Sequence, residues 1–92
     1  MNIQHEQTPS KGAFYVEHDS KRLAEMSYSK AGPNKLIIDH TEVDESLKGQ
    51  GIGLKLLLAL IDYVRANNIK VIPLCPFANS VFAKREDLRD VL

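Results

Sequence analysis

The sequence predicts an α+β fold: a mixed sheet whose N-terminal strands are antiparallel, followed by a strand, a helix, a strand and a helix. Apolar and polar side chains alternate in short runs of the first half, which is typical of strands. From residue 51 to about residue 68 the apolar side chains instead recur with helical spacing. A short apolar run follows at residues 70–74, and a strand–helix–strand unit normally joins two parallel strands by a right-handed crossover.

The expected strands of the first half are separated by turn residues. Phe14 and Val16 share one face of the run at 13–18, and Asp19-Ser20-Lys21 turns the chain toward the next run. Residues 31–34, Ala-Gly-Pro-Asn, break the chain before a run rich in β-branched side chains. The expected strands are a short edge strand at 3–6, then 13–18, 22–28 and 35–43.

Two helices are expected in the second half. The asparagines at 67 and 68 are a plausible end for the long helix, and Asn79 is expected to cap the last helix, which continues through residues 81–83. The tail at 85–92 is amphipathic, and its pattern alone does not decide its structure. The expected apolar face of the long helix consists of Leu54, Leu57, Leu58, Ile61 and Val64, and it is widened by Leu56, Leu60 and Tyr63.

Length and composition limit the classes of function. We expect one domain over residues 1–92, and 43% hydrophobic with 26% charged residues is a globular mixture. Basic and acidic residues both number 12, which argues against a broad electrostatic attraction to nucleic acid or to an anionic membrane. The single cysteine forms no internal disulfide, and no signal peptide or spanning helix is visible. We therefore expect a cytoplasmic protein, either a monomer or a weak homodimer.

A glycine-rich segment lies between the strand at 35–43 and the long helix. It reads Lys48-Gly49-Gln50-Gly51-Ile52-Gly53-Leu54. Free N–H groups at a helix start suit a phosphate, and glycines let the backbone approach the anion closely. The alternative interpretation is a glycine-rich turn that binds nothing. A Walker A loop does not fit, because Gly53 is not followed by Lys-Ser/Thr, and a G-x-G-x-x-G fingerprint would need a third glycine at Leu54.

The segment resembles the pyrophosphate loop of the GNAT N-acetyltransferase superfamily, written Q/R-x-x-G-x-G/A. Lys48, Gly51 and Gly53 occupy its defining positions, although Lys48 keeps only the charge and loses the guanidinium fork. His40-Thr41-Glu42-Val43 resembles the central strand that pairs with the pantetheine arm, and Leu74-Cys75-Pro76-Phe77 lies where the next parallel strand ends. Residues 35 to about 84 resemble the cofactor half of a miniature branch of this superfamily, after an abbreviated acceptor half.

The resemblance implies acetyl-CoA, or coenzyme A, as the cofactor. It implies transfer of the acetyl group to an amine on a small molecule or a protein. The alternative is a non-catalytic module that binds CoA or acyl-CoA, or a protein partner. The residues implied in cofactor binding are Thr41, Val43, Lys48, Gly49, Gln50, Gly51, Ile52, Gly53, Leu54 and Asn79.

Three residues are candidates for the chemistry. Larger members of the superfamily often protonate the departing thiolate with a tyrosine, but Phe82 stands in the matching region here. Cys75, at the end of the strand, is the substitute candidate, either as a nucleophile or as a proton donor; otherwise it is a small buried apolar residue. His40 and Glu42 alternate onto one face of the strand, and either is a candidate base or a surface polar pair. One cysteine and three scattered histidines predict no metal site.

Overall fold

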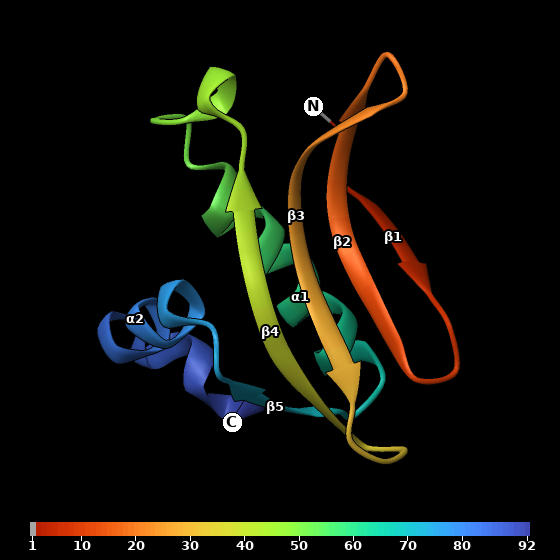
Figure 1. Ribbon diagram of the computed structural model, residues 1–92. Coiled ribbons are helices and arrows are strands. Elements are labelled where there is room, and N and C mark those ends of the chain that lie inside the picture. Colours follow the sequence, from red (N-terminus) through yellow and green to blue (C-terminus); the bar gives the residue numbers. More distant parts are fainter. Residues whose placement is uncertain (1) are drawn as a thin grey trace.

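Residues 2–92 are described by a computed structural model in which five strands form one sheet, in the order β1-β2-β3-β4-β5 (Figure 1). The first four strands pair antiparallel, and β5 runs parallel to β4. This mixed sheet confirms the predicted fold class. The strands are β1 Gln4–Gln7, β2 Lys11–His18, β3 Lys21–Lys30, β4 Lys35–Val43 and β5 Lys70–Pro73; the helices are α1 Ile52–Ala66, α2 Pro76–Lys84 and the short 3₁₀-helices Glu45–Leu47 (η1) and Glu86–Val91 (η2).

Helix α1 covers one face of the sheet, here called the inner face, and leaves the opposite, outer face open (Figure 1). Alternate side chains of β2, β3 and β4 point inward and pack against the apolar face of α1. Within the predicted apolar face, Leu56, Leu57, Leu60, Ile61 and Val64 are buried, whereas Leu54, Leu58 and Tyr63 are only partly buried. The side chains that fill this core include Phe14, Val16, Ala24, Met26, Tyr28, Leu36, Ile38, Leu56, Leu57, Leu60, Ile61 and Val64.

One extra residue in β4 changes which face its second half presents. Ile38 pairs with Tyr28, but the next pair is His40 with Ser27, so Asp39 has no partner in β3. Such a β-bulge shifts the alternation of side chains by one residue. Thr41 therefore lies opposite the buried Met26.

The bulge sorts the last four residues of β4 between the two faces. Thr41 and Val43 point to the inner face, because their partners in β3 are buried against α1. His40 and Glu42 point to the outer face and are exposed, and their spacing had predicted that they share one face. Without the extra residue the two sets would exchange faces.

The expected start of the last helix is wrong. Helix α2 begins at Pro76 with Cys75 as its N-cap, and Asn79 lies inside the first turn, where its backbone N–H donates to the Cys75 carbonyl at 2.9 Å. Proline suits this position because its φ is preset for a helix and its missing N–H is not needed there. The chain after α2 forms η2, whose Leu88 joins the core, and none of the helices within residues 2–92 is long and apolar enough to cross a membrane.

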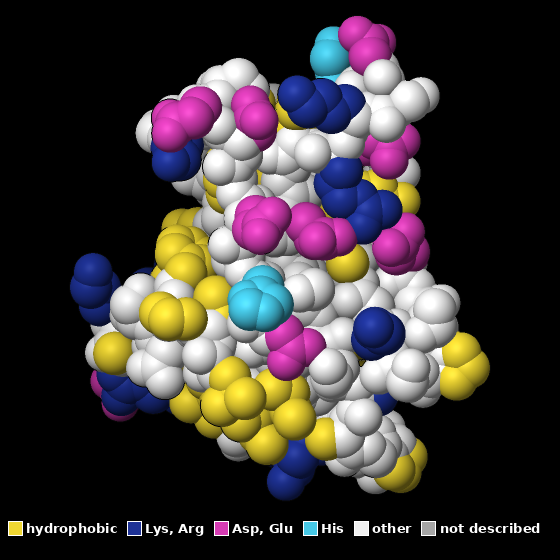
Figure 2. All heavy atoms as spheres, in the orientation of Figure 1, with side chains coloured by type: hydrophobic (Ala, Val, Ile, Leu, Met, Phe, Trp, Pro, Cys, Tyr) yellow, Lys and Arg dark blue, Asp and Glu magenta, His cyan; other side chains and the backbone are white. Residues whose placement is uncertain are grey.

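Charged and apolar side chains separate on the outer face. Figure 2 shows acidic and basic side chains and a histidine over β3 and β4, and apolar side chains gathered near β5. Ile72 and Leu74, at the β5 end of this face, are 37% and 66% exposed.

His5 joins the edge strand β1 to the core. Its ring stacks on Phe14, with centroids 4.0 Å apart, and meets the edge of Tyr63 from α1 at 4.6 Å. The ring nitrogen Nε2 lies 2.7 Å from the Tyr28 hydroxyl. Burial lowers the pKa of His5, and the nearby Lys30 lowers it further, whereas burial and the neighbouring Tyr63 raise the pKa of Tyr28 to about 12. The neutral imidazole is therefore the form that the fold stabilises.

This lowered pKa predicts a loss of stability in mild acid. Above the ordinary histidine value of about 6.5 the imidazole is neutral in both states, and its contribution is fully present. As the pH falls through the lowered pKa of the folded state, the unfolded chain binds more protons and the contribution disappears. Urea unfolding at pH 7.5 and 5.5 should show a smaller pH effect in His5→Phe than in the wild-type protein. The matched control is the exposed His18, and equal pH effects in His5→Phe and His18→Phe would contradict the prediction.

Candidate active site

Strand β4 continues beyond the point where its pairing with β5 ends. The parallel register runs from Lys35 opposite Lys70 to Ile38 opposite Pro73, and the Cys75 N–H then donates to the Ile38 carbonyl at 3.0 Å. The chain then turns away into α2 while β4 goes on to Val43 (Figure 1). The second half of β4 therefore has an unpaired edge on the side where β5 would otherwise lie.

Backbone groups of Thr41 and Val43 point toward this open edge. The Asp44 N–H donates to the Leu23 carbonyl in β3 at 2.7 Å. In an antiparallel ladder, alternate residues direct both backbone polar groups to the same neighbour. Glu42 and His40 thus face β3 with Asp44, and Thr41 and Val43 present their N–H and C=O groups to the opening. An extended amide-containing ligand could pair with them.

The loop after β4 is fixed by its own polar groups. Asp44 accepts hydrogen bonds from the Ser46 hydroxyl at 2.7 Å and from the Ser46 N–H at 3.1 Å, and these bonds lower the pKa of Asp44. Lys48 pairs with Glu45 at 3.0 Å and remains largely exposed. This arrangement leads the chain through η1 directly to the glycines.

Two of the glycines adopt conformations that other residues rarely take. Gly49 has a φ of +82° and Gly51 a φ of +69°, both in the left-handed region. A Cβ atom at either position would meet nothing within 4 Å, so the reason for glycine is the backbone conformation and the open space beside it. Gly53 is different, because its Cβ would lie 3.0 Å from the Phe77 ring.

The start of α1 leaves three backbone N–H groups without helical partners. The first hydrogen bond of the helix runs from Lys55 to the Gly51 carbonyl, at 3.1 Å, which leaves Ile52, Gly53 and Leu54 as free donors. The capping residue is Gly51, which has no side chain to accept from them, and no acidic residue lies in the first turn. Free donors and the positive end of the helix dipole suit an anion.

The glycine loop, the start of α1 and the end of β4 enclose one groove of about 660 Å³. Phe77 of α2 forms part of its wall, although it was not among the predicted binding residues and was named only as part of the run at 74–77. In the structure, Phe77 is a large aromatic residue in the first turn of α2, and it is 36% exposed. The lining residues are Thr41, Glu42, Val43, Leu47, Lys48, Gly49, Gly51, Ile52, Gly53, Leu54 and Phe77.

Most of the residues that the resemblance implied in cofactor binding line this groove, but two do not. Gln50 is exposed, and its amide donates to the Ser46 carbonyl at 3.4 Å. Asn79 lies in α2 and donates to the Pro73 carbonyl at 3.4 Å. Both side chains therefore support local structure instead of facing the groove.

Cys75 lies beside the groove but is covered. Its side chain is 3% exposed, and its sulfur is 3.1 Å from the Thr41 hydroxyl. Thr41 lines the groove, whereas Cys75 does not. Phe82, in the region where a tyrosine is common, is buried and supplies no hydroxyl. The link between the thiol and the groove is therefore Thr41, which contacts the sulfur and lines the groove.

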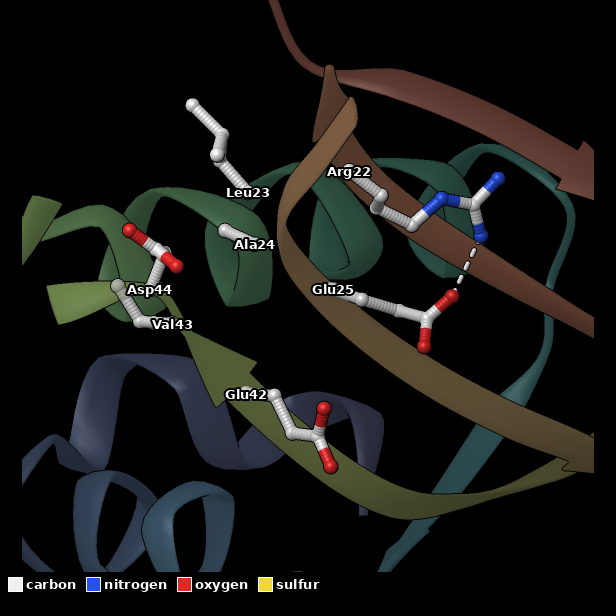
Figure 3. A pocket seen from close by; sticks show the side chains of 7 residues that line it. All are labelled: Arg22, Leu23, Ala24, Glu25, Glu42, Val43 and Asp44. Atoms are coloured by element: carbon white, nitrogen blue, oxygen red, sulfur yellow. Dashed lines mark hydrogen bonds and ion pairs between the residues drawn. The ribbon is translucent and has the colours of Figure 1, made fainter. Parts of the chain in front are cut away.

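His40 and Glu42 lie on the other side of the same strand. Glu42 extends over the outer face beside Glu25 of β3, above a shallow cleft of about 320 Å³ (Figure 3). Glu25 is held in an ion pair with Arg22, whose guanidinium also binds Glu6 at 3.0 Å. Within residues 2–92 the side chains of His40 and Glu42 form no hydrogen bond or ion pair. Both remain available to a ligand, and no three potential metal ligands gather in this part of the chain.

Comparisons with known proteins agree on one fold. The family model described as GCN5-related N-acetyl-transferase matches residues 13–91. A GCN5-like protein from Staphylococcus aureus, solved by NMR, is 37% identical, with a TM-score of 0.72 over 98% of this chain and 87% of that one. No curated protein matches the sequence significantly.

Two more distant structures share the fold at low identity. The ribosomal-protein-alanine N-acetyltransferase from Brucella melitensis biovar Abortus 2308 has a TM-score of 0.68 at 16% identity, covering 84% of this chain and 62% of that one. An acetyltransferase from Vibrio fischeri has a TM-score of 0.60 at 10% identity, covering 74% and 63%.

The contact between Gly53 and Phe77 gives a test of how the groove wall is packed. In a Phe77→Ala background, Gly53→Ala should stabilise the protein by up to about 1 kcal/mol, because alanine favours a helix. With Phe77 present the same methyl group meets the ring at 3.0 Å, so this gain should be lost. Urea unfolding of the four proteins should give a coupling of about 1 kcal/mol. Equal effects of Gly53→Ala in both backgrounds would contradict the packing.

Proposed function

Because the chain belongs to the GCN5-related N-acetyltransferase family, we propose that it transfers the acetyl group of acetyl-CoA to an amine. By family it is an N-acetyltransferase; the donor and the acceptor are the subject of the proposal. The observation that carries it is the groove, which joins the free donors at the start of α1 to the unpaired edge of β4.

The two ends of the groove suit the two parts of the donor. The pyrophosphate of acetyl-CoA would lie against the N–H groups at 52–54, where Gly49 and Gly51 leave open space for it. The amides of the pantetheine arm would pair with the backbone of Thr41 and Val43, as an added strand does at a sheet edge. The thioester would then lie near Thr41, beside the buried Cys75.

The acceptor nitrogen must lose a proton in the reaction. A lysine-type amine has a reference pKa of about 10.4, so its neutral form costs about 4.6 kcal/mol at pH 7. Within the described residues, the side chains of His40 and Glu42 have no polar partner, and both lie on the outer face of the strand beside which the thioester would lie. They are the proposed bases, acting directly or through water. An acceptor amine would therefore approach from the outer face.

The acceptor is proposed only as a class, an amine of a small molecule or a protein. The Brucella protein is named for an alanine of a ribosomal protein, but at 16% identity the likeness concerns the fold alone. A panel of polyamines, amino acids and N-terminal peptides, assayed with acetyl-CoA, would identify the acceptor. Tight binding of CoA without transfer to any amine would instead favour a non-catalytic acyl-CoA-binding module.

Gly51→Ala tests the placement of CoA. The methyl group would occupy the open space at the start of α1, so calorimetry should show at least about a tenfold loss of CoA affinity, or about 1.4 kcal/mol. The positive φ also makes any side chain at this position cost about 1–2 kcal/mol of stability. Gly32→Ala is the matched control, since Gly32 has a φ of +105° with open space beside it and lies outside the groove. Unchanged CoA affinity in a folded Gly51→Ala protein would exclude this placement.

The bases are tested by single substitutions on the outer face. If one of them deprotonates the acceptor, His40→Ala or Glu42→Gln should lower kcat on the order of 100-fold. The affinity for CoA should change little, because both side chains point to the outer face, although Glu42 also borders the groove. Glu17→Gln, an exposed acidic residue of β2, serves as the control for surface charge. Wild-type rates in both variants across pH would show that the acceptor arrives already neutral.

A further inference from the structure

Among the hydrogen bonds within residues 2–92, the Cys75 sulfur has one side-chain partner, the hydroxyl of Thr41. It lies 3.1 Å from the Cys75 sulfur, and geometry alone allows either atom to donate. Thr41 also lines the groove, whereas the thiol is 3% exposed and does not. A group leaving from the groove thus meets the hydroxyl first and the sulfur behind it.

The β4 bulge places this hydroxyl on the inner face. Because Asp39 is unpaired, Thr41 lies opposite Met26 on the face that α1 covers. The hydrogen bond from the Cys75 N–H to the Ile38 carbonyl holds the cysteine one residue before the bulge. Both partners of the contact are therefore fixed by backbone pairing, and the side chains need no rearrangement to meet.

We propose that Thr41 and Cys75 form a two-member proton relay for the departing CoA sulfur. The inference rests on the proposed function, because it assumes that the thioester lies beside Thr41. In the resting state the Cys75 S–H donates to the Thr41 oxygen, and the Thr41 O–H points into the groove. Thr41 is then the residue that touches the substrate, and Cys75 acts through it.

The step balances in atoms and charge. The amine adds to the thioester carbonyl, and the carbon–sulfur bond then breaks, with its electron pair going to the CoA sulfur. The Thr41 hydroxyl gives its proton to that sulfur as it takes the proton of the Cys75 thiol, so that Cys75 ends as a thiolate. The proton released by the acceptor nitrogen passes to the base on the outer face and, through solvent, restores the thiol. The products are the acetylated amine and CoA thiol.

The relay explains why two residues are needed. An alcohol is a far weaker acid than a thiol, so Thr41 alone would have to form an alkoxide, which is too unstable. With Cys75 behind it, the proton passes in effect from one alkyl thiol to another alkyl thiolate, and no alkoxide has to accumulate. A buried thiol alone would not reach the leaving group.

The experiment uses Thr41→Val, Thr41→Ser, Cys75→Ala and the Thr41→Val/Cys75→Ala double variant of the full chain. Cys75 is the only cysteine, so its S–H stretching band in the infrared is unambiguous. The band should move to higher frequency in Thr41→Val, which has lost the acceptor, and return in Thr41→Ser. This measurement needs no turnover and no bound CoA.

Kinetics with acetyl-CoA and the best amine of the panel provide the second measurement. Thr41→Val and Cys75→Ala should each lower kcat on the order of 10- to 100-fold, and the double variant should fall no further, because a relay is lost as a unit. Thr41→Ser should retain most of the rate. CoA affinity should change little in all four, since the Thr41 backbone groups remain.

Several outcomes would overturn the relay. These are an S–H band that does not respond to Thr41→Val, a wild-type kcat in Thr41→Val, or additive losses in the double variant. Acetyl-Cys75 that forms and decays as fast as turnover would show a covalent mechanism instead. CoA binding with no transfer by the wild-type protein would overturn the proposed function and the relay together, whereas the other outcomes overturn the relay alone.

Discussion

The unpaired Asp39 in β4 is the constraint on which the rest of the site depends. Because this residue has no partner in β3, every side chain after it changes face. In a regular strand, Glu42 and His40 would point at α1 and bury a charge and an imidazole in an apolar core, which is costly. Thr41 would point away from Cys75. The Ser29 hydroxyl donates to the Asp39 carboxylate and helps to hold the bulge in place.

The groove is built mainly from backbone groups. Its proposed donors are the N–H groups at the start of α1 and the edge of β4, and its space is created by residues without side chains at 49 and 51. Backbone recognition needs few residues, because a helix end and a strand end supply it wherever they meet. A site made mainly of backbone groups can therefore be formed by a chain of only 92 residues.

Features that depend on local chemistry could be predicted from the sequence. The change of period at residue 51 separated strands from helix, and the glycine spacing identified a loop that requires positive φ. Asn67 and Asn68 marked the end of α1, where Asn68 adopts a φ of +54°. The alternation of His40 and Glu42 predicted a shared face, although the strand pattern could not say which face.

Features that depend on contacts between distant segments could not be predicted from the sequence. The sequence around Asp39 does not show which residue forms the β-bulge, because the position of the bulge is decided by the pairing of β4 with β3. The start of α2 was placed at Asn79 by its capping ability, but Pro76 and the bond from Cys75 to Ile38 begin the helix earlier. Phe77 became a wall of the groove only because α2 brings it against Gly53, far away in the sequence. The burial of Cys75 is likewise a property of the packed structure.

The distribution of polar side chains between the two faces of β4 also bears on whether Cys75 could act as a nucleophile. A cysteine nucleophile usually needs a base within hydrogen-bonding reach, because the thiolate is the reactive form. His40, in the strand that Cys75 packs beside, points to the opposite face. The polar neighbour of the sulfur is the hydroxyl of Thr41. An alcohol is too weak a base to activate a thiol as a nucleophile, but it can accept a hydrogen bond from the thiol and pass a proton on in a concerted step. The strand thus keeps the proposed base on the side from which an amine would approach, and the Cys75 thiol lies on the side where the CoA sulfur would leave.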